Sequence, residues 1–550
     1  MTLRSAVVAV CLVALAAPLR AQEGPWVADQ TAVSIPMRDG KSLAADVWLP
    51  AKPGRYPAVV VQTPYDRKLQ RWALEGMDDR RSWDREHYAY VVADWRGFFG
   101  SRAAGPARPG QRGQDGFDVV EWTAAQTWSD GKVGTWGPSA LGRVQLDTAA
   151  ERPPHLVCCV PLVAPIGQSY DDYYEGGVYK EAHVAKLDAL GFGVGTSVHD
   201  RPDPDAPAWK LAKRLARPER IDVPMLFITG WFDHATAREL DTFRTLLSVG
   251  GSNARDGSRL LVGPWHHVAI DQVQQGDLAF PAAAGEAARE VRAFLDFHLR
   301  GVADGGWAAR PRVRVWRCNE EGWHGGTAWP FPAAVEATWT LHASGVIDRA
   351  ESAIDEAARR YLDDPASPVP TVGGANLPAP GLLAGPRDQA PLLGRDDVLV
   401  WTTAPLAAPL RLDGVATLSV FLACDKPDTD LAVRLCEVLA DGRTMLLGDA
   451  IQRASFRNAP VREPLVAGQP SRMTVTLPPL AVTFPKGSRL RLVVSGTNWP
   501  RFERNGHSGA PHLDPAKSSP AKVEILHDAA HPARLVLPLL PPPVATPEVR

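Results

Sequence analysis

A glycine-rich segment at residues 131–142, Gly-Lys-Val-Gly-Thr-Trp-Gly-Pro-Ser-Ala-Leu-Gly, constrains the fold more than any other part of the chain. Residues 133–136 predict a strand and residues 143–151 a helix, which places Ser139 at the turn between them. Glycines suit such a turn because strand and helix backbones pass too close there for a Cβ atom. The pattern indicates a nucleophile elbow, with helix N–H groups near the serine that could hold an oxyanion. The second glycine comes one residue later than in G-x-S-x-G, so a plain turn with an exposed serine is the alternative.

Continuous apolar runs elsewhere in the first half of the chain predict central strands of a parallel sheet, buried on both faces. These runs, together with the strand before Ser139, are residues 58–61, 89–93, 133–136, 156–163, 225–229 and 260–262. The helix-like stretches between and after them are residues 116–128, 143–151, 235–247 and 285–299. Alternation of strands and helices predicts an α/β fold.

The chain has 550 residues, which is too long for one ordinary domain. A polar, aromatic and helix-prone insertion interrupts the α/β pattern, and we expect it to form a cap over the site. Further on, short apolar runs separated by turns predict an all-β sandwich or jelly roll. The expected organisation is a signal peptide (1–21), an α/β domain in two parts (22–164 and 219–310), the cap (165–218), a connecting segment (311–396), a jelly-roll β domain (397–540) and a disordered tail (541–550).

The N-terminus has the features of a cleavable export signal: Arg4, a short apolar run over residues 6–17, and Ala21 before the expected cleavage at Gln22. We therefore expect a secreted or periplasmic protein. The formal net charge of −2 gives no basic excess for binding nucleic acid or anionic membranes. No G-x-G-x-x-G follows a predicted strand, so no nucleotide or flavin cofactor is expected.

The cysteines show no metal-binding spacing. Cys158 and Cys159 fall in a predicted buried strand, and most cysteines are expected to be core thiols. Cys424 and Cys436 could pair in an oxidising compartment, although nothing in the sequence requires it.

Two later strand ends carry the partners that a nucleophilic serine needs. Gly-Trp-Phe-Asp ends at Asp233, and Gly-Pro-Trp-His-His ends at His266 and His267. The order serine, acid, histidine is that of α/β-hydrolases, and strand ends on one edge of a parallel sheet converge. The sequence therefore predicts a catalytic triad of Ser139, Asp233 and one of the two histidines. A metal site made of Asp233, His234, His266 and His267 is disfavoured because the spacing matches no metal motif.

These motifs resemble those of the CocE/NonD-type hydrolases, the cocaine-esterase-like branch of the Xaa-Pro dipeptidyl-peptidase superfamily. The resemblance spans about residues 30–540. It rests on the three motifs at residues 134–142, 230–233 and 263–267, and on Thr-Pro-Tyr-Asp (63–66), Asp-Gly-Phe-Asp (115–118), Pro-Asp-Thr-Asp (427–430) and Asn-Trp-Pro-Arg-Phe (498–502). It implies an α/β-hydrolase fold with an inserted helical cap and a C-terminal jelly roll.

The resemblance also implies roles for five residues. Ser139 is then the nucleophile, Asp233 the acid and His267 the base, while the Tyr65 hydroxyl and the N–H of Ala140 form the oxyanion hole. His266 stands where the family usually has a small hydroxyl residue. The implied activity is that of a serine hydrolase that cleaves ester or amide bonds of small acyl substrates through an acyl-enzyme, without a cofactor or metal.

The chain departs from the family pattern in two places. Ala140 replaces a tyrosine of the family's elbow, and Pro138 precedes the nucleophile, where its ring restricts the backbone. These departures leave a catalytically impaired binding protein as one alternative.

A second alternative is Xaa-Pro dipeptidyl-peptidase activity, which requires a site for a free amine. Family members that act on α-amino acid esters carry acidic residues just after the catalytic aspartate, where this chain has Ala235 and Thr236. Asp171, Asp172 and Glu175 in the cap could replace them, but a solvated acidic face is the favoured interpretation.

Overall fold

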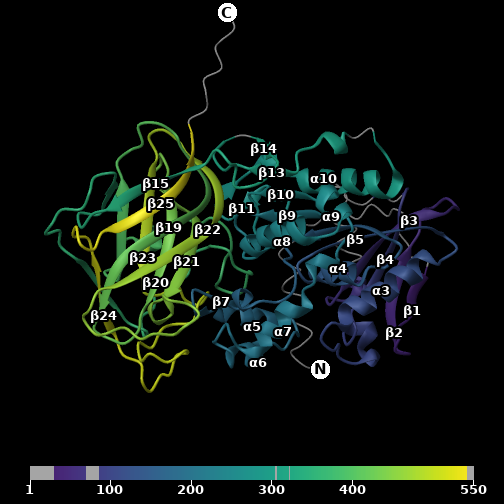
Figure 1. Cartoon of the computed structure of the whole chain (residues 1–550), viewed down its shortest axis with the longest axis horizontal. Coiled ribbons are helices and arrows are strands. Elements are labelled where there is room, and N and C mark those ends of the chain that lie inside the picture. Colours follow the sequence, from purple (N-terminus) through teal and green to yellow (C-terminus); the bar gives the residue numbers. More distant parts are fainter. Residues whose placement is uncertain (1–29, 70–83, 85, 304–305, 321, 542–550) are drawn as a thin grey trace, which may run out of the picture.

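A computed structural model describes residues 30–69, 84, 86–303, 306–320 and 322–541 of the chain. Figure 1 shows two lobes, an α/β domain formed by the first half of the chain and a β domain formed by the second, with the helices α5 to α7 beside the junction. The predicted signal peptide and nearly all of the predicted tail lie outside the described residues. Within the described part, no helix combines the length and apolar character needed to cross a bilayer.

The α/β domain is built on a ten-stranded sheet in the order β1-β2-β4-β3-β5-β6-β9-β10-β13-β14. From β4 to β13 every neighbouring pair is parallel, and the outer pairs are antiparallel. Its strands are β1 (Gln30–Pro36), β2 (Ser42–Trp48), β3 (Tyr56–Thr63), β4 (Ala89–Asp94), β5 (Ser129–Pro138), β6 (Leu156–Leu162), β9 (Leu226–Gly230), β10 (Arg259–Gly263), β13 (Val313–Trp316) and β14 (Trp323–Gly326). The central strands β3 and β4 are buried almost throughout, which explains their uninterrupted apolar sequences.

Helices connect these strands and cover the sheet. They are η1 (Phe99–Ala104), α3 (Gln111–Ala124), α4 (Ala140–Glu151), α8 (Thr236–Val249), α9 (Ser252–Gly257), η4 (Pro281–Ala283), α10 (Glu286–Leu295), η5 (Asp296–Arg300) and η6 (Trp307–Ala309), with the small hairpin β11 (Gln274–Gln275) and β12 (Leu278–Ala279). Helix α3 begins five residues before its predicted start, directly after Gly110, whose φ of 77° interrupts the preceding chain.

The predicted insertion forms a cap of short elements beside the junction of the lobes (Figure 1). They are η2 (Tyr170–Asp172), β7 (Tyr174–Glu175), β8 (Val178–Tyr179), α5 (Glu181–Ala189), α6 (Gly195–His199), α7 (Pro207–Leu215) and η3 (Pro218–Arg220). An aromatic cluster that includes Tyr170, Tyr174 and Trp209 holds the cap together, and Phe456 of the β domain packs into it.

The C-terminal domain consists almost entirely of strands, as predicted. They are β15 (Val335–Leu341), β16 (Val346–Asp348), β17 (Arg359–Asp363), β18 (Val398–Thr403), β19 (Leu410–Cys424), β20 (Asp430–Val438), β21 (Thr444–Arg453), β22 (Ser471–Phe484), β23 (Arg489–Ser495), β24 (Ala521–Leu526) and β25 (Ala533–Leu540), with the short turns η7 (Ala390–Leu392) and η8 (Ala454–Phe456). All eleven strands are connected in one sheet. The jelly-roll topology itself stays a prediction.

Two details differ from the sequence-based expectations. The segment 311–396 is not only a connection, because β13 and β14 complete the first sheet while β15 to β17 belong to the second. These strands are short or partly exposed, so they lack the apolar runs that marked the central strands. The pairing considered for Cys424 and Cys436 does not form: both are buried free thiols, as are Cys158, Cys159 and Cys318.

A buried ion pair fastens the chain where it passes between the two domains. Arg317, one residue after β13, pairs with Asp413 of β19, and neither side chain is exposed. Arg317 also donates to the carbonyl of Leu412 at 2.9 Å, and Asp413 accepts the N–H of Phe331 at 2.9 Å. Removal of one partner would leave the other charge buried without compensation.

We predict that Arg317→Met lowers the free energy of unfolding by about 3–5 kcal/mol, because the Asp413 carboxylate would be buried alone. Urea denaturation followed by circular dichroism measures the change. Arg360→Met is the matched control, since the Arg360–Glu524 pair leaves 69% and 40% of its side chains exposed, and we expect it to shift the midpoint little. Similar midpoints for the two variants would contradict this account of the junction.

Candidate active site

Ser139 occupies a strained turn between β5 and α4. Its backbone has φ 56° and ψ −120°, values that an L-residue adopts only when its surroundings enforce them. The N–H of Ser139 donates to the carbonyl of Leu162 at 2.8 Å, and the Ser139 carbonyl accepts the N–H of Arg143 at 2.9 Å. The turn is thus tied both to the neighbouring strand and to the helix behind it, which is the geometry of a nucleophile elbow.

The two glycines of the motif are required by close approach. A Cβ atom on Gly137 would lie 2.4 Å from Cβ of Leu141, and one on Gly142 would lie 2.4 Å from Cβ of Ala164. Gly142 thus serves the role of the second glycine although it stands one residue later than expected. Pro138 is accommodated at the last position of β5, opposite Leu162, where the sheet can tolerate it.

Asp233 and His267 form a short hydrogen bond after the ends of β9 and β10. Nδ1 of His267 lies 2.6 Å from Oδ2 of Asp233, and the other carboxylate oxygen accepts the N–H of Ala235 at 2.6 Å. The Asp233 side chain is fully buried and that of His267 nearly so. The carboxylate therefore fixes the orientation of the imidazole and can stabilise its charged form.

Tyr65 follows β3 and its hydroxyl lies near the side chain of Ser139. Burial raises the pKa of Tyr65 to about 12, although the Ser139 side chain and the charge of Arg143 oppose this shift. The phenol therefore keeps its proton and can donate a hydrogen bond. Ala140 is the first residue of α4, where N–H groups have no partner within the helix, so its N–H can serve as the second oxyanion donor.

Arg143 shows that the elements around Ser139 converge. Its charge opposes the rise in the pKa of Tyr65. It also helps to lower the pKa of His234, after the larger effects of burial, two neighbouring imidazoles and Lys180. The structure therefore brings Tyr65 and the residues around Asp233 to the same edge of the sheet as the elbow. Arg143 was not predicted, although it lies four residues after Ser139, on the same face of α4.

Histidines next to the Asp233–His267 pair are held without charge. The His234 ring lies 4.5 Å from that of His267, and the His183 ring of the cap lies 4.8 Å from that of His234. Burial lowers the pKa of His183 to about 3 and that of His266 to about 4, and it also lowers the pKa of His234. Each neutral imidazole offers one N–H donor and one acceptor.

The three acidic residues of the cap differ in their surroundings. Asp172 is not part of a solvated face: it is largely buried and accepts hydrogen bonds from Arg143 at 2.9 Å and from Arg238 at 2.5 Å. These two guanidinium groups lower the pKa of Asp172 in spite of its burial. Asp171 is exposed, and Glu175 lies 3.6 Å from Lys180. Asp172 is therefore fully committed to its two arginines.

Glu239 is a buried carboxyl group that sequence analysis did not single out. It lies on α8, its Oε2 accepts the N–H of Ala164 at 2.8 Å, and it is completely buried. Burial, and then the neighbouring charge of Asp233, raise the pKa of Glu239. Burial and the nearby Asp233 carboxylate therefore both disfavour a negative charge on Glu239. No local pattern in the sequence marks this role, because it depends on contact between α8 and the end of β6.

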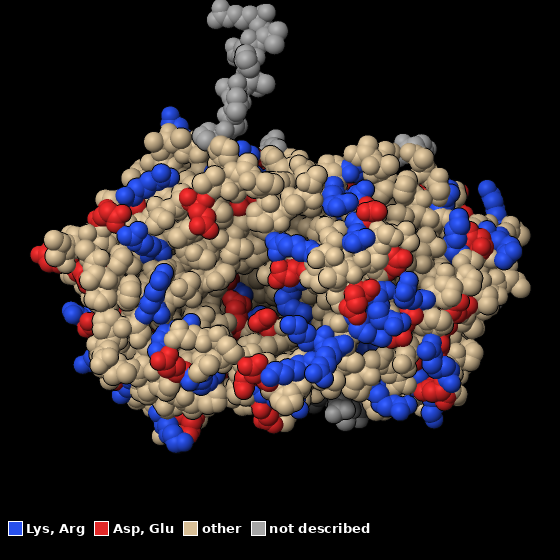
Figure 2. Space-filling model, in the orientation of Figure 1, with Lys and Arg blue, Asp and Glu red and all other residues tan. Residues whose placement is uncertain are grey.

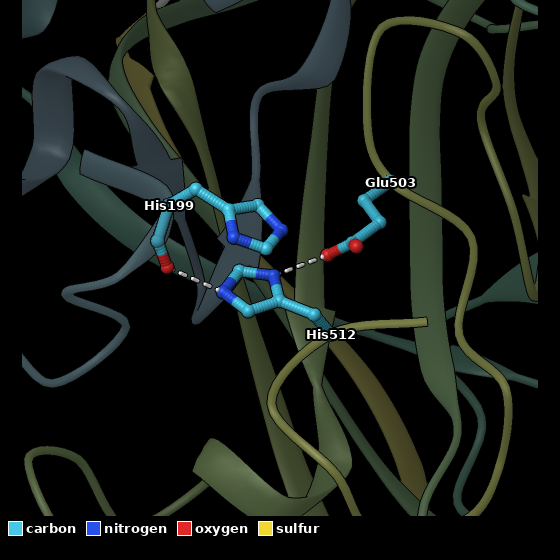
Figure 3. A group of neighbouring side chains, drawn as sticks. All are labelled: His199, Glu503 and His512. Atoms are coloured by element: carbon cyan, nitrogen blue, oxygen red, sulfur yellow. Dashed lines mark hydrogen bonds and ion pairs between the residues drawn. The ribbon is translucent and has the colours of Figure 1, made fainter. Parts of the chain in front are cut away.

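Two groups of side chains within the described residues have metal-ligand atoms close together. The first, Asp233, His234 and His267, already uses its Asp233 oxygen and its His267 Nδ1 in the pair described above. The second joins His199 of the cap with Glu503 and His512 of the β domain (Figure 3). Neither group was predicted as a metal site.

The geometry of the second group is that of an interdomain contact. His512 Nδ1 lies 2.9 Å from Oε2 of Glu503, and its Nε2 lies 2.8 Å from the carbonyl oxygen of His199 (Figure 3). The His199 and His512 rings stack at 3.7 Å, so their lone pairs do not point to one centre. The contact instead fastens α6 to the β domain.

A serine held at such an elbow, with a carboxylate-bound histidine and a tyrosine hydroxyl at the same sheet edge, is the arrangement of an α/β-hydrolase. The chain is accordingly a serine hydrolase that acts on ester or amide bonds.

Comparison with known proteins defines the family. The profile of X-Pro dipeptidyl-peptidase (S15 family) matches residues 39–218, and that of the X-Pro dipeptidyl-peptidase C-terminal non-catalytic domain matches residues 305–536. A cocaine esterase from Rhodococcus sp. (strain MB1 Bresler) is 29% identical over 573 residues, which cover 92% of this chain and 98% of that protein. The two profiles together span most of the chain, which belongs to the X-Pro dipeptidyl-peptidase superfamily and is similar to its cocaine-esterase-like branch.

Other similar proteins agree with this assignment. A putative serine esterase from Mycobacterium bovis (strain ATCC BAA-935 / AF2122/97) is 24% identical over 629 residues, covering 92% of this chain and 95% of that protein. An aminopeptidase from a Thaumarchaeota archaeon has a TM-score of 0.80 at 23% identity, covering 96% of this chain and 99% of its own. An α-amino acid ester hydrolase has a TM-score of 0.77 at 22% identity, covering 95% and 100%. At these identities, the similarity to the two solved structures shows that they share the fold of this chain.

We predict that Tyr65→Phe lowers kcat by ~10²–10³ with little change in KM. In the wild type the Tyr65 hydroxyl binds the oxyanion of the transition state and not the substrate in its ground state, and the variant lacks this hydroxyl. Initial-rate assays over a range of concentrations of a neutral ester measure kcat and KM. Because the pKa of Tyr65 is about 12, the wild type should show no loss of kcat/KM from tyrosine ionisation up to pH 10. An equal kcat for the two proteins would remove Tyr65 from the oxyanion hole.

Proposed function

We propose that this protein is a carboxylesterase or acylase that forms an acyl-enzyme on Ser139. In the proposed reaction His267 takes the proton of the Ser139 hydroxyl while the oxygen attacks the carbonyl carbon. The Tyr65 hydroxyl and the Ala140 N–H stabilise the oxyanion. His267 then returns the proton to the leaving group, and water completes the cycle by the same steps. The observation that carries the proposal is the strained elbow serine at the sheet edge that also holds Tyr65 and the 2.6 Å Asp233–His267 pair.

Ester or acylated amide substrates are favoured over peptides with a free N-terminus. Recognition of an ammonium group needs a carboxylate that is not already paired. Asp172 is bound by two arginines, and Ala235 and Thr236 stand where related enzymes carry acidic residues. The relatives named as an aminopeptidase and as an α-amino acid ester hydrolase share the fold, so their substrates are the alternatives that an assay must compare.

The proposal extends to location and to the β domain. Arg4, the apolar run at residues 6–17 and Ala21 support export with cleavage before Gln22, which places the enzyme outside the cytoplasm. The β domain, for which we propose a jelly roll, supplies Arg501 and Leu382 to the cavity beside His234. We propose that it completes the substrate pocket, and that neither nucleic acid nor a membrane is a partner.

We predict that the mature protein hydrolyses 4-nitrophenyl butyrate and that Ser139→Ala lowers kcat by at least ~10⁴, because the nucleophile is lost while binding remains. Release of 4-nitrophenol measures the rate, and Ala-Pro-4-nitroanilide tests for dipeptidyl-peptidase activity in parallel. Ser197→Ala, at an exposed position of the cap, is the control and should behave as wild type.

Three other results would revise the proposal. Faster cleavage of the dipeptide anilide than of the ester would favour a peptidase. Unchanged ester hydrolysis by Ser139→Ala would exclude Ser139 as the nucleophile. Inactivity of well-folded wild type towards the whole panel would favour a binding protein.

A further inference from the structure

A small cavity lies beside the Asp233–His267 pair, where three parts of the chain meet. His234 comes from the α/β domain, Lys180 and His183 come from the start of the cap helix α5, and Arg501 comes from the β domain. The cavity has about 20 Å³ of space for the centre of a water-sized group, enough for one polar end group of a substrate. Figure 2 shows this face of the molecule hollowed between the two lobes, with charged residues around the hollow.

The described residues that line the cavity include two cations and no carboxylate. Lys180 donates one hydrogen bond, to the carbonyl of Asp171 at 2.8 Å. Glu175 lies 3.6 Å from both Lys180 and Arg501, beyond direct hydrogen-bond distance. Arg501 pairs with Asp449 at 2.5 Å through one of its nitrogens. Since a lysine has three donors and an arginine five, both side chains retain donors for a ligand.

The charged groups around the cavity are mostly paired, and the cations among them keep donors that face it. The single carboxylate of Asp172 pairs with the two guanidinium groups of Arg143 and Arg238, so these three side chains together carry one positive charge. Burial comes first among the causes that lower the pKa of His234, and Lys180 and Arg143 add to the shift. A carboxylate placed in the cavity could accept charge-assisted hydrogen bonds from Lys180 and Arg501 and further hydrogen bonds from the neutral imidazoles.

We propose that the cavity binds a carboxylate carried by the substrate, so that the enzyme prefers anionic esters over neutral esters of the same shape. This inference rests on the proposed function, because it concerns the pocket of the same hydrolytic site. Lys180 and Arg501 would form the charged side of the pocket, and His183 and His234 would contribute neutral donors. The preferred substrates are then half-esters of short dicarboxylic acids, or esters whose alcohol part bears a carboxylate.

Two matched pairs of esters test the inference and show on which side the carboxylate lies. The 4-nitrophenyl monoester of glutaric acid is compared with 4-nitrophenyl pentanoate, and 4-acetoxybenzoate with phenyl acetate. Each kcat/KM is divided by the rate of hydroxide-catalysed hydrolysis of the same ester. We expect the anionic member of at least one pair to exceed its neutral partner by about tenfold, the size of one hydrogen bond between charged groups.

Variants then assign the preference to the cavity. Lys180→Met is expected to lower the anionic-to-neutral ratio about tenfold. Lys213→Met removes an exposed lysine from α7 of the same cap and should leave the ratio unchanged. Faster hydrolysis of the neutral ester in both pairs would overturn the inference, as would a ratio that Lys180→Met does not alter.

The outcomes separate this inference from the function on which it rests. If neutral esters are hydrolysed through Ser139 and the anionic ones show no advantage, the hydrolase remains and the carboxylate pocket is wrong. If no ester of either kind is hydrolysed, the proposed function itself fails.

Discussion

The site depends on the backbone of Ser139, which is held at φ 56° by its surroundings. The strain persists because α4 packs closely against the end of β5 at Gly137 and against the chain after β6 at Gly142, where neither glycine has room for a Cβ atom. One backbone turn therefore presents the serine near the Tyr65 hydroxyl and places the N–H of Ala140 at a helix start. The parallel sheet supplies the rest, because its strand ends deliver Tyr65, Ser139, Asp233 and His267 to one edge.

Charge in the surrounding shell is arranged so that few groups next to the reaction centre change their protonation near neutral pH. Two arginines favour the ionised form of Asp172, burial raises the pKa of Glu239, and burial lowers the pKa values of His183 and His234. The Asp233 carboxylate is thereby left to orient His267. The cap and the β domain contribute to this arrangement. The ion pairs and hydrogen bonds that hold the cap and the β domain in place therefore also affect the active site.

Much of the α/β domain could be predicted from the sequence, because its central strands are continuous apolar runs and its motifs are local. The elbow, the strand ends at Asp233 and His267, and the helices between them follow from such patterns. The connecting segment was only partly predicted, since β15 and β17 leave several of their residues exposed and lack the continuous apolar runs of the central strands. The environment of Asp172 could not be predicted, because Arg143 and Arg238 come from two other helices and meet it only in the folded chain. The same holds for His183 and for His512, whose contacts cross domain boundaries.

The central claim is that the elbow makes Ser139 an activated nucleophile. Treatment of the wild type with a fluorophosphonate probe, followed by digestion and mass spectrometry, tests it most directly. The account predicts stoichiometric labelling of the peptide that contains Ser139, and loss of that label in His267→Ala, which retains the serine but lacks the base. Absence of label on folded wild type, or label on a different serine, would contradict the account.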